Sequence, residues 1–154
     1  MANPLLPQCA DNTYRGSRFA LWFFGLFVLV KLAISLGSIF NGHEAAGSAD
    51  GIPLDTFTPA GARTVVSLFA LLGLSNLISC LVCLLVLIRY RTLVPIMFAL
   101  LLLQHLGGKL ALYFLPIPRT GVPPGIVINL VLLALLVVGL GLSLRSRANP
   151  QVQG

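Results

Sequence analysis

The feature that most constrains this sequence is a set of four long apolar runs separated by short polar segments. The runs cover residues 19–40, 64–88, 93–114 and 125–144. An α-helix rises about 1.5 Å per residue, so each run can cross the roughly 30 Å hydrocarbon core of a bilayer. We therefore predict an all-α fold: an integral membrane four-helix bundle with four transmembrane spans.

Composition agrees with a chain that is surrounded by lipid. Hydrophobic residues make up 57% of the chain and charged residues only 9%, whereas charged residues form about 25% of an average soluble domain. The segments between the runs are too short to hold a core of their own, so a functional site is expected among the helices. The chain has a net charge of +6, and its arginines lie beside the runs. Cations there set orientation and contact anionic headgroups, so membrane lipid is an expected partner and nucleic acid is not.

Basic residues predict the orientation of the spans. One side of the predicted membrane carries six arginines, which are Arg15, Arg18, Arg89, Arg91, Arg145 and Arg147. The other side carries two, Arg63 and Arg119, together with Glu44, Asp50 and Asp55. The positive-inside rule then places both termini in the cytoplasm, with tails over residues 1–18 and 145–154. Arginine outnumbers lysine eight to two, which fits a GC-rich genome, and we expect a bacterial cytoplasmic membrane.

The connections between the runs differ in character. Residues 41–62 are rich in Gly, Ala, Ser, Asp and Pro and are expected to form an exposed loop, with Thr58 and Pro59 starting the second helix. The connection over residues 89–92 is tight and predicts that the second and third spans are antiparallel neighbours. The third connection, residues 115–124, contains four prolines and should be stiff and extended.

Aromatic and small residues predict how the spans sit and pack. Interfacial anchors are expected in two groups, which are Phe19, Trp22, Phe23 and Phe24 on the inner side and Tyr113 and Phe114 on the outer side. Close helix packing is expected at two sets of small residues, which are Ser75, Ser79 and Cys83 in the second span and Gly107, Gly108 and Ala111 in the third.

Polar residues inside the spans gather in their outer halves. The set comprises Lys31, Asn76, His105, Lys109 and Asn129. A lysine at the centre of a membrane costs roughly 2.5–3.5 kcal/mol, so such residues are usually paired, near an end or facing a cavity. The pattern predicts a ligand pocket that opens outward. The alternative is that the asparagines form hydrogen bonds between helices while the lysines extend to lipid phosphates.

Lys31 is the deeper of the two lysines, and no Asp or Glu lies within any span. Its partner should be Asp50 or Asp55 folding back from the outer loop, a lipid phosphate, or an anionic or carbonyl-bearing ligand. The lack of a membrane carboxylate argues against a proton- or sodium-coupled carrier, while an anion-selective path lined by the lysines stays open.

Two cysteines, Cys80 and Cys83, form a C-x-x-C pair in the second span. This spacing occurs in four-helix membrane thiol oxidoreductases, which place the pair near the outer surface and have a second pair. Here the pair lies on the inner side, and the other cysteine, Cys9, is expected in the cytoplasm. Packing by small apolar side chains is therefore favoured over redox chemistry. No repeated ligand spacing is present, so no metal site and no cofactor is predicted.

The first span contains Gly25 and a Lys31-Leu32 turn, the second span is polar, and a short basic hairpin, Arg89-Tyr90-Arg91, leads to two further spans. This helix layout resembles the DoxX-like group of four-helix bacterial membrane proteins. The resemblance implies a four-helix membrane protein with a redox or quinone-linked role. The chain departs from the pattern in the second span, where residues 75–79 stand in place of a glutamate and adjacent glycines.

These observations favour a small multi-pass membrane protein without enzymatic activity. Its expected role is interaction or assembly, as a homo-oligomer or as an accessory subunit of other membrane proteins. The alternative is a binder or reductase of a lipophilic, quinone-like ligand that uses the polar pocket in the outer half of the bundle. No catalytic residue is assigned, because few positioned acid–base or redox groups are available.

Overall fold

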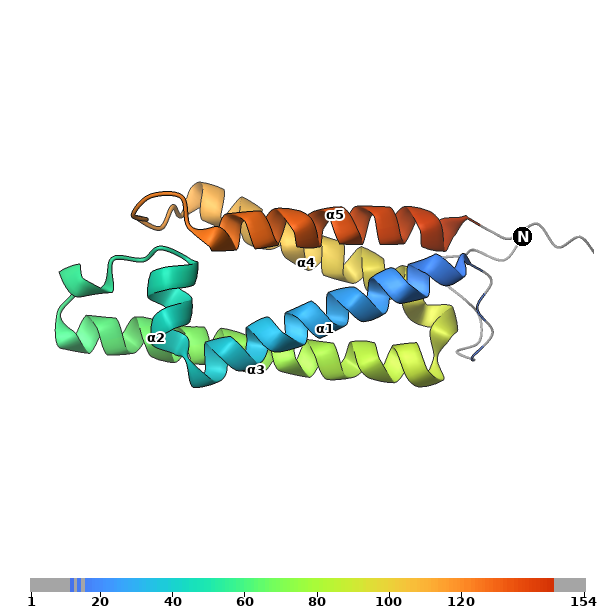
Figure 1. Cartoon of the computed structure of the whole chain (residues 1–154), viewed down its shortest axis with the longest axis horizontal. Helices are drawn as coiled ribbons and strands as arrows, with labels where there is room; N and C mark the ends of the chain where they lie inside the picture. Colours follow the sequence, from blue (N-terminus) through green and yellow to red (C-terminus); the bar gives the residue numbers. More distant parts are fainter. Residues whose placement is uncertain (1–11, 13, 15, 146–154) are drawn as a thin grey trace, which may run out of the picture.

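The computed structural model describes residues 12, 14 and 16–145, and that part of the chain is all-α (Figure 1). The four long helices are α1 (Arg18–Phe40), α3 (Pro59–Arg89), α4 (Val94–Phe114) and α5 (Pro124–Leu144). Each is long and apolar enough to cross a membrane. The prediction of a multi-pass membrane protein with four spans is confirmed.

Four short elements join the long helices. They are α2 (Gly42–Glu44), the π-helix η1 (Ala45–Ala49), and the 3₁₀ turns η2 (Leu54–Thr56) and η3 (Arg91–Leu93). As expected, α3 begins well before its apolar run, at Pro59. The side chain of Thr58 caps this helix, since its Oγ1 accepts a hydrogen bond of 3.2 Å from the amide of Gly61.

The N-terminal end of α1 and the C-terminal end of α5 lie at the same end of the bundle (Figure 1). We call this the terminal end; it carries Arg18, Arg89, Arg91 and Arg145. The opposite end, called the loop end, carries Arg63, Arg119 and the three described acidic residues. The arginines that the orientation prediction uses are therefore grouped by end, and which side of the membrane each end faces stays a prediction. Of the predicted tails, the structure describes residues 12, 14, 16–18 and 145. Arg15, Arg147 and Cys9 lie outside the described residues.

The apolar core fills the terminal half of the bundle. The buried residues of its main cluster are Ala20, Phe24, Phe27 and Val28 of α1, Cys80, Cys83 and Val86 of α3, Val94, Phe98 and Leu101 of α4, and Leu132 and Leu136 of α5. The rings of Phe24 and Phe98 meet edge to face, with centroids 5.0 Å apart. The prediction of Phe24 as an interfacial anchor is wrong, because the ring is fully buried, whereas Trp22 is 79% exposed.

The closest helix crossing joins α1 to α3 at Gly73. A Cβ at this position would lie 2.9 Å from both the Ser35 carbonyl oxygen and Ser38 Cβ. The predicted packing stripe on this span is only partly correct. Ser75 is exposed and Cys83 is in the core, and the missing side chain of Gly73 makes the close approach possible.

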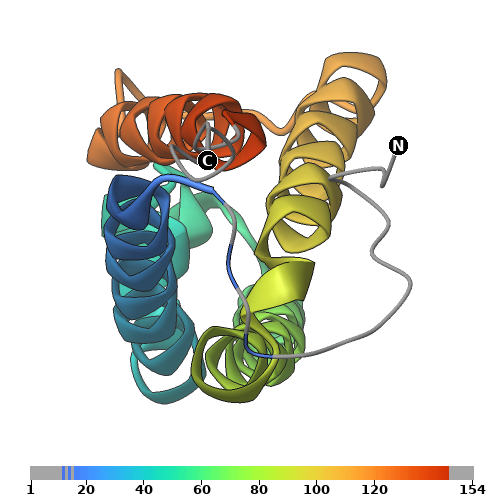
Figure 2. The same ribbon diagram turned by 90° about the vertical axis from the view of Figure 1, so that its right-hand side faces the viewer.

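The position of α4 differs from the prediction. The η3 hairpin brings α3 and α4 together at the terminal end, but α4 then diverges from α3 and packs mainly against α5 (Figures 1 and 2). Phe98 helps to hold α4 there, because its ring fills the space beside Gly139 of α5. Every residue from 106 to 114 is exposed, and nothing lies within 4 Å of a Cβ placed at Gly107 or Gly108. The predicted close packing of Gly107, Gly108 and Ala111 within this chain is wrong.

The segment between α1 and α3 folds over the loop end instead of forming an exposed loop. Its helical turns bury Ala46, Ile52 and Leu54 against Val65, Val66 and Phe69 of α3. Gly51 has a φ of +71°, a backbone conformation that suits glycine. The amide of Thr120 donates a 2.8 Å hydrogen bond to the Gly51 carbonyl, so the first and third connections are joined.

Candidate ligand cavity

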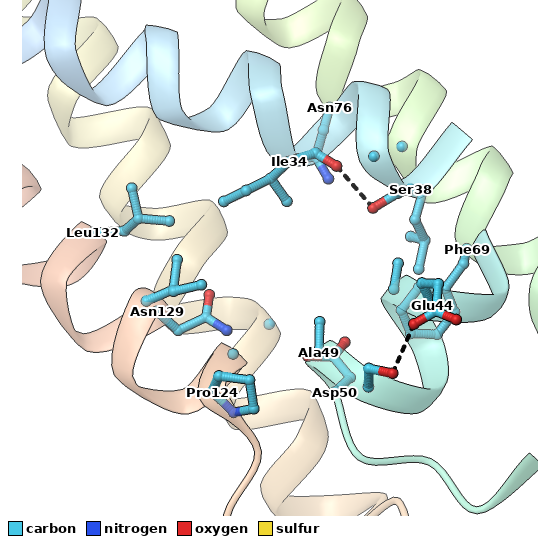
Figure 3. Close-up of a pocket in the computed structure, with 18 of the residues that line it drawn as sticks. Ile34, Ser38, Glu44, Ala49, Asp50, Phe69, Asn76, Pro124, Asn129 and Leu132 are labelled. Carbon is cyan, nitrogen blue, oxygen red and sulfur yellow. Dashed lines mark hydrogen bonds between the residues drawn. The ribbon is translucent and has the colours of Figure 1, made fainter. Parts of the chain in front are cut away.

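The loop half of the bundle contains a cavity of about 890 Å³ (Figure 3). Its walls come from α1, α3, α4 and α5, and the α2–η1 segment closes one end. Pockets that hold drug-sized ligands measure roughly 300–1,000 Å³. The volume is therefore sufficient for a lipophilic molecule of that size.

The floor of the cavity is polar and lies directly above the apolar core. It contains Lys31 of α1, Asn76 of α3 and Asn129 of α5. Each is one helical turn from a buried residue of the core, namely Val28, Cys80 and Leu132. The ammonium of Lys31 donates a hydrogen bond to Asn76 Oδ1 at 3.5 Å. Three helices thus bring hydrogen-bond donors and acceptors to the walls of one cavity.

The ammonium of Lys31 has no carboxylate partner within the described part of the chain. Its only hydrogen bond is the long one to the neutral Asn76 amide. The expected partners Asp50 and Asp55 form no ion pair with it, because Lys31 lies nine residues before the end of α1, which is about 14 Å deeper. Of the three kinds of partner expected from the sequence, this removes the loop carboxylates.

The walls between the floor and the loop end are mostly apolar. Ile34, Phe69, Leu72, Ile128 and Leu132 contribute the larger apolar side chains. Gly37 of α1 also lines the cavity, and a Cβ there would meet nothing within 4 Å. A hydrocarbon chain or ring could therefore occupy this region without burying unsatisfied polar groups.

The rim at the loop end carries charges of both signs. Glu44 accepts a 2.8 Å hydrogen bond from Ser48, and Asp50 lies beside the start of α5 (Figure 3). Burial raises the pKa of Asp50, and the nearby Arg119 guanidinium opposes part of that rise. Sequence reasoning named Asp50 as a partner of Lys31 and missed the rim as a group, because Arg119 lies on a connection far from Glu44 and Asp50 in the chain.

Two of the five predicted pocket residues do not line the cavity. Lys109 is exposed on the loop half of α4. His105 is half-buried beside the Asn129 backbone, and its Nε2 atom is buried without a hydrogen-bond partner among the described residues. The structure therefore brings Lys31, Asn76 and Asn129 together, places His105 next to them and leaves Lys109 outside.

The two cysteines lie in the core below the floor. Cys80 and Cys83 are both buried and neither is part of a disulfide. Neither lines the cavity. In the part of the chain that the structure describes, no group of three or more His, Cys, Asp or Glu side chains is arranged to hold a metal ion.

The fold and the cavity define a small four-span membrane protein with a polar-floored, apolar-walled cavity in one half of its bundle. No protein-family model, curated protein or solved structure matches the chain.

Proposed function

We propose that this protein binds a lipophilic ligand in the cavity and does not transform it. The observation that carries the proposal is the floor formed by Lys31, Asn76 and Asn129 beneath apolar walls. A ligand with oxygen atoms at one end and an apolar body would accept hydrogen bonds from the floor and fill the walls.

Quinone-like molecules belong to this class, because their carbonyl oxygens accept hydrogen bonds and their rings and tails are apolar. The resemblance in layout to the DoxX-like group motivates including them. A reductase would also need a route for electrons, and the buried cysteines do not line the cavity. Binding without chemistry is therefore the proposal that the geometry supports best.

The test is to fill the cavity by mutation and measure ligand retention. Gly37→Leu introduces a side chain into the open space on the cavity wall. Gly141→Leu is a matched control, since Gly141 is also in a helix with open space around it but lies near the terminal end of α5. Both changes should improve helix propensity by about 1 kcal/mol, so folding is not expected to suffer.

Each variant is purified in a mild detergent and its co-purifying lipophilic molecules are identified by mass spectrometry. We expect a bound molecule in the wild type and in Gly141→Leu, and at least a tenfold loss in Gly37→Leu. Binding of added decylubiquinone is measured in parallel. Equal ligand content in all three proteins would show that the cavity is not a binding site.

A second candidate function, a subunit role, is favoured by the exposed loop half of α4. Gln104 is exposed there, and a polar group that faces lipid is costly. Gly107 and Gly108 would allow another helix to approach closely, because no side chain in the described part of the chain covers them.

This candidate predicts association through α4, with a second copy of the chain as the partner that can be tested directly. Native mass spectrometry should then show dimers for the wild type and Gly141→Leu but mainly monomers for Gly107→Leu. Monomers throughout would exclude self-association through this face.

A further inference from the structure

We propose that the cavity selects amphiphiles with a negatively charged head, a carboxylate or phosphate, which binds at Lys31 while the acyl chain leaves between α3 and α4. This inference rests on the proposed function and specifies its ligand class.

Lys31 places a positive charge on the cavity floor. Lys31 is a cation in the middle of a bundle, and its one recorded hydrogen bond is a 3.5 Å contact to a neutral amide. A buried charge is strongly destabilising unless an opposite charge or several hydrogen bonds compensate it. No described carboxylate reaches it, so an anionic head would supply the opposite charge. A neutral quinone carbonyl would offer only a dipole.

Two side-chain amides, those of Asn76 and Asn129, add hydrogen-bond donors to the cavity. A carboxylate or phosphate has more acceptor sites than Lys31 alone can use. Asn76 and Asn129 line the same cavity, and their side-chain NH₂ groups are donors available to the remaining oxygens. The three residues therefore form a site in which every floor group has a role toward one anionic head.

Acidic residues lie on the path by which a ligand would enter the cavity from the loop end. An anion that entered through the rim would pass Glu44 and Asp50, both of which line the loop end of the cavity. Arg119 is close enough to offset Asp50, but Glu44 is bonded only to the Ser48 hydroxyl in the described contacts. Repulsion from Glu44 and Asp50 therefore disfavours this route for an anion.

The side between α3 and α4 is open instead. Leu72 of α3 and Leu112 of α4 both line the cavity and yet are 60% and 40% exposed. The two helices diverge toward the loop end (Figure 2), and Gly108 lines the cavity with no neighbour within 4 Å of a Cβ. An acyl chain can therefore pass from the cavity into the surrounding lipid while its head remains at Lys31.

The experiment compares three probes with the same acyl chain: oleate, oleoyl-lysophosphatidate and oleyl alcohol. Their Kd values are measured for the full chain in a neutral detergent or in nanodiscs of zwitterionic lipid. The wild type should bind at least one anionic probe tenfold or more tightly than the alcohol. Preference for oleate or for the lysophosphatidate identifies a carboxylate or a phosphate as the natural head.

Lys31→Met should abolish this preference and leave alcohol binding within about twofold. Lys31→Arg keeps the positive charge and should retain the preference. Lys109→Met is the matched control, because it removes a lysine that lies outside the cavity, and it should bind like the wild type. Lys31→Met removes a half-buried charge that has no carboxylate partner among the described residues, so its Tm in detergent should be equal to or above that of the wild type. An unchanged or raised Tm shows that any loss of binding is not a loss of folding.

The path of the acyl chain is determined by photo-crosslinking with an oleate that carries a diazirine near the end of its chain. Labels are expected on peptides that include Leu72 or Leu112. Labelling confined to the α2–η1 segment would overturn the lateral exit.

Failure of the inference differs from failure of the proposed function. Equal affinity for the alcohol and the anions, with binding still lost in Gly37→Leu, would overturn the anionic head and leave the cavity as a binding site. An unchanged preference in Lys31→Met would also overturn it. Absence of binding for all probes, including decylubiquinone, would contradict both.

Discussion

Lys31 and Lys109 are both lysines inside membrane spans, and the structure gives them different surroundings. Lys109 is exposed and lies five residues before the end of α4, so its ammonium can extend to the lipid–water interface. Lys31 lies about 14 Å from the end of α1 and lines a cavity. The same residue type is therefore inexpensive in one place and in need of a partner in the other.

The environment of Asp50 makes the stability of the protein depend on pH. Burial raises its pKa above the ordinary value of 3.8. Between 3.8 and the raised value, the folded state binds more protons than the unfolded state, so stability falls as pH rises through that window and stays level above it.

Replacing Asp50 with Asn should remove this pH dependence. In detergent, the Tm of Asp50→Asn should exceed that of the wild type at neutral pH, and the difference should shrink as the pH approaches 3.8. Asp55→Asn is the control, because it removes the same charge from an exposed position. A Tm difference for Asp50→Asn that is largest at low pH would contradict this reasoning.

The cysteines provide a third test at the residue scale. Both thiols are buried in the core, so the double variant Cys80→Ala/Cys83→Ala should lose only packing, about 1 kcal/mol for each site. It should insert and bind ligand like the wild type. A double variant with normal Tm and expression but no function would instead show that the thiols take part in chemistry.

At the scale of elements, the crossing of α1 and α3 fixes the cavity floor. Gly73 lets α1 approach so closely that a Cβ would meet the Ser35 carbonyl oxygen and Ser38. Asn76 is one turn further along α3 and thereby reaches Lys31. The Ser35 hydroxyl donates a 2.7 Å hydrogen bond to the Lys31 carbonyl, which uses that hydroxyl within α1.

Gly73→Ala should therefore separate α1 from α3 and destabilise the protein by about 1–3 kcal/mol, the usual range for overpacking. Gly107→Ala is the matched control, because its Cβ meets open space, and it should be neutral or stabilising by up to about 1 kcal/mol. Thermal unfolding in detergent distinguishes them. Equal stability of the two variants would show that the crossing can relax at little cost.

At the scale of the whole molecule, the bundle is asymmetric along its length. The terminal half is packed around Phe24, Phe98 and their neighbours, whereas the loop half contains a cavity and a diverging α4. The positive charge of the described arginines is concentrated at the packed end. The cavity is therefore expected to lie in the half of the membrane opposite the cytoplasm, given the positive-inside rule.

Reporter fusions test this orientation. Fusions after Asp50, Tyr90 and Gly121 and at Gly154 should report outside, inside, outside and inside, respectively. A cytoplasmic signal from the Asp50 fusion would reverse the orientation and place the cavity on the cytoplasmic side.

The sequence by itself determined the number of spans, their approximate bounds and the start of α3, because these depend on local hydrophobicity and on capping groups adjacent in the chain. It also indicated the depth of the polar floor, since Lys31, Asn76 and Asn129 lie at fixed distances from the span ends. These are properties of separate helices.

Only the tertiary structure decided which faces of those helices meet. In lipid, apolar helices lack a strong hydrophobic preference for any face, so contacts depend on shape, such as Gly73 against Ser35 and Phe98 against Gly139. That packing directs α4 toward α5, which leaves Lys109 outside and opens the cavity beside α3. A sequence pattern cannot show this, because the contacting residues belong to segments far apart in the chain.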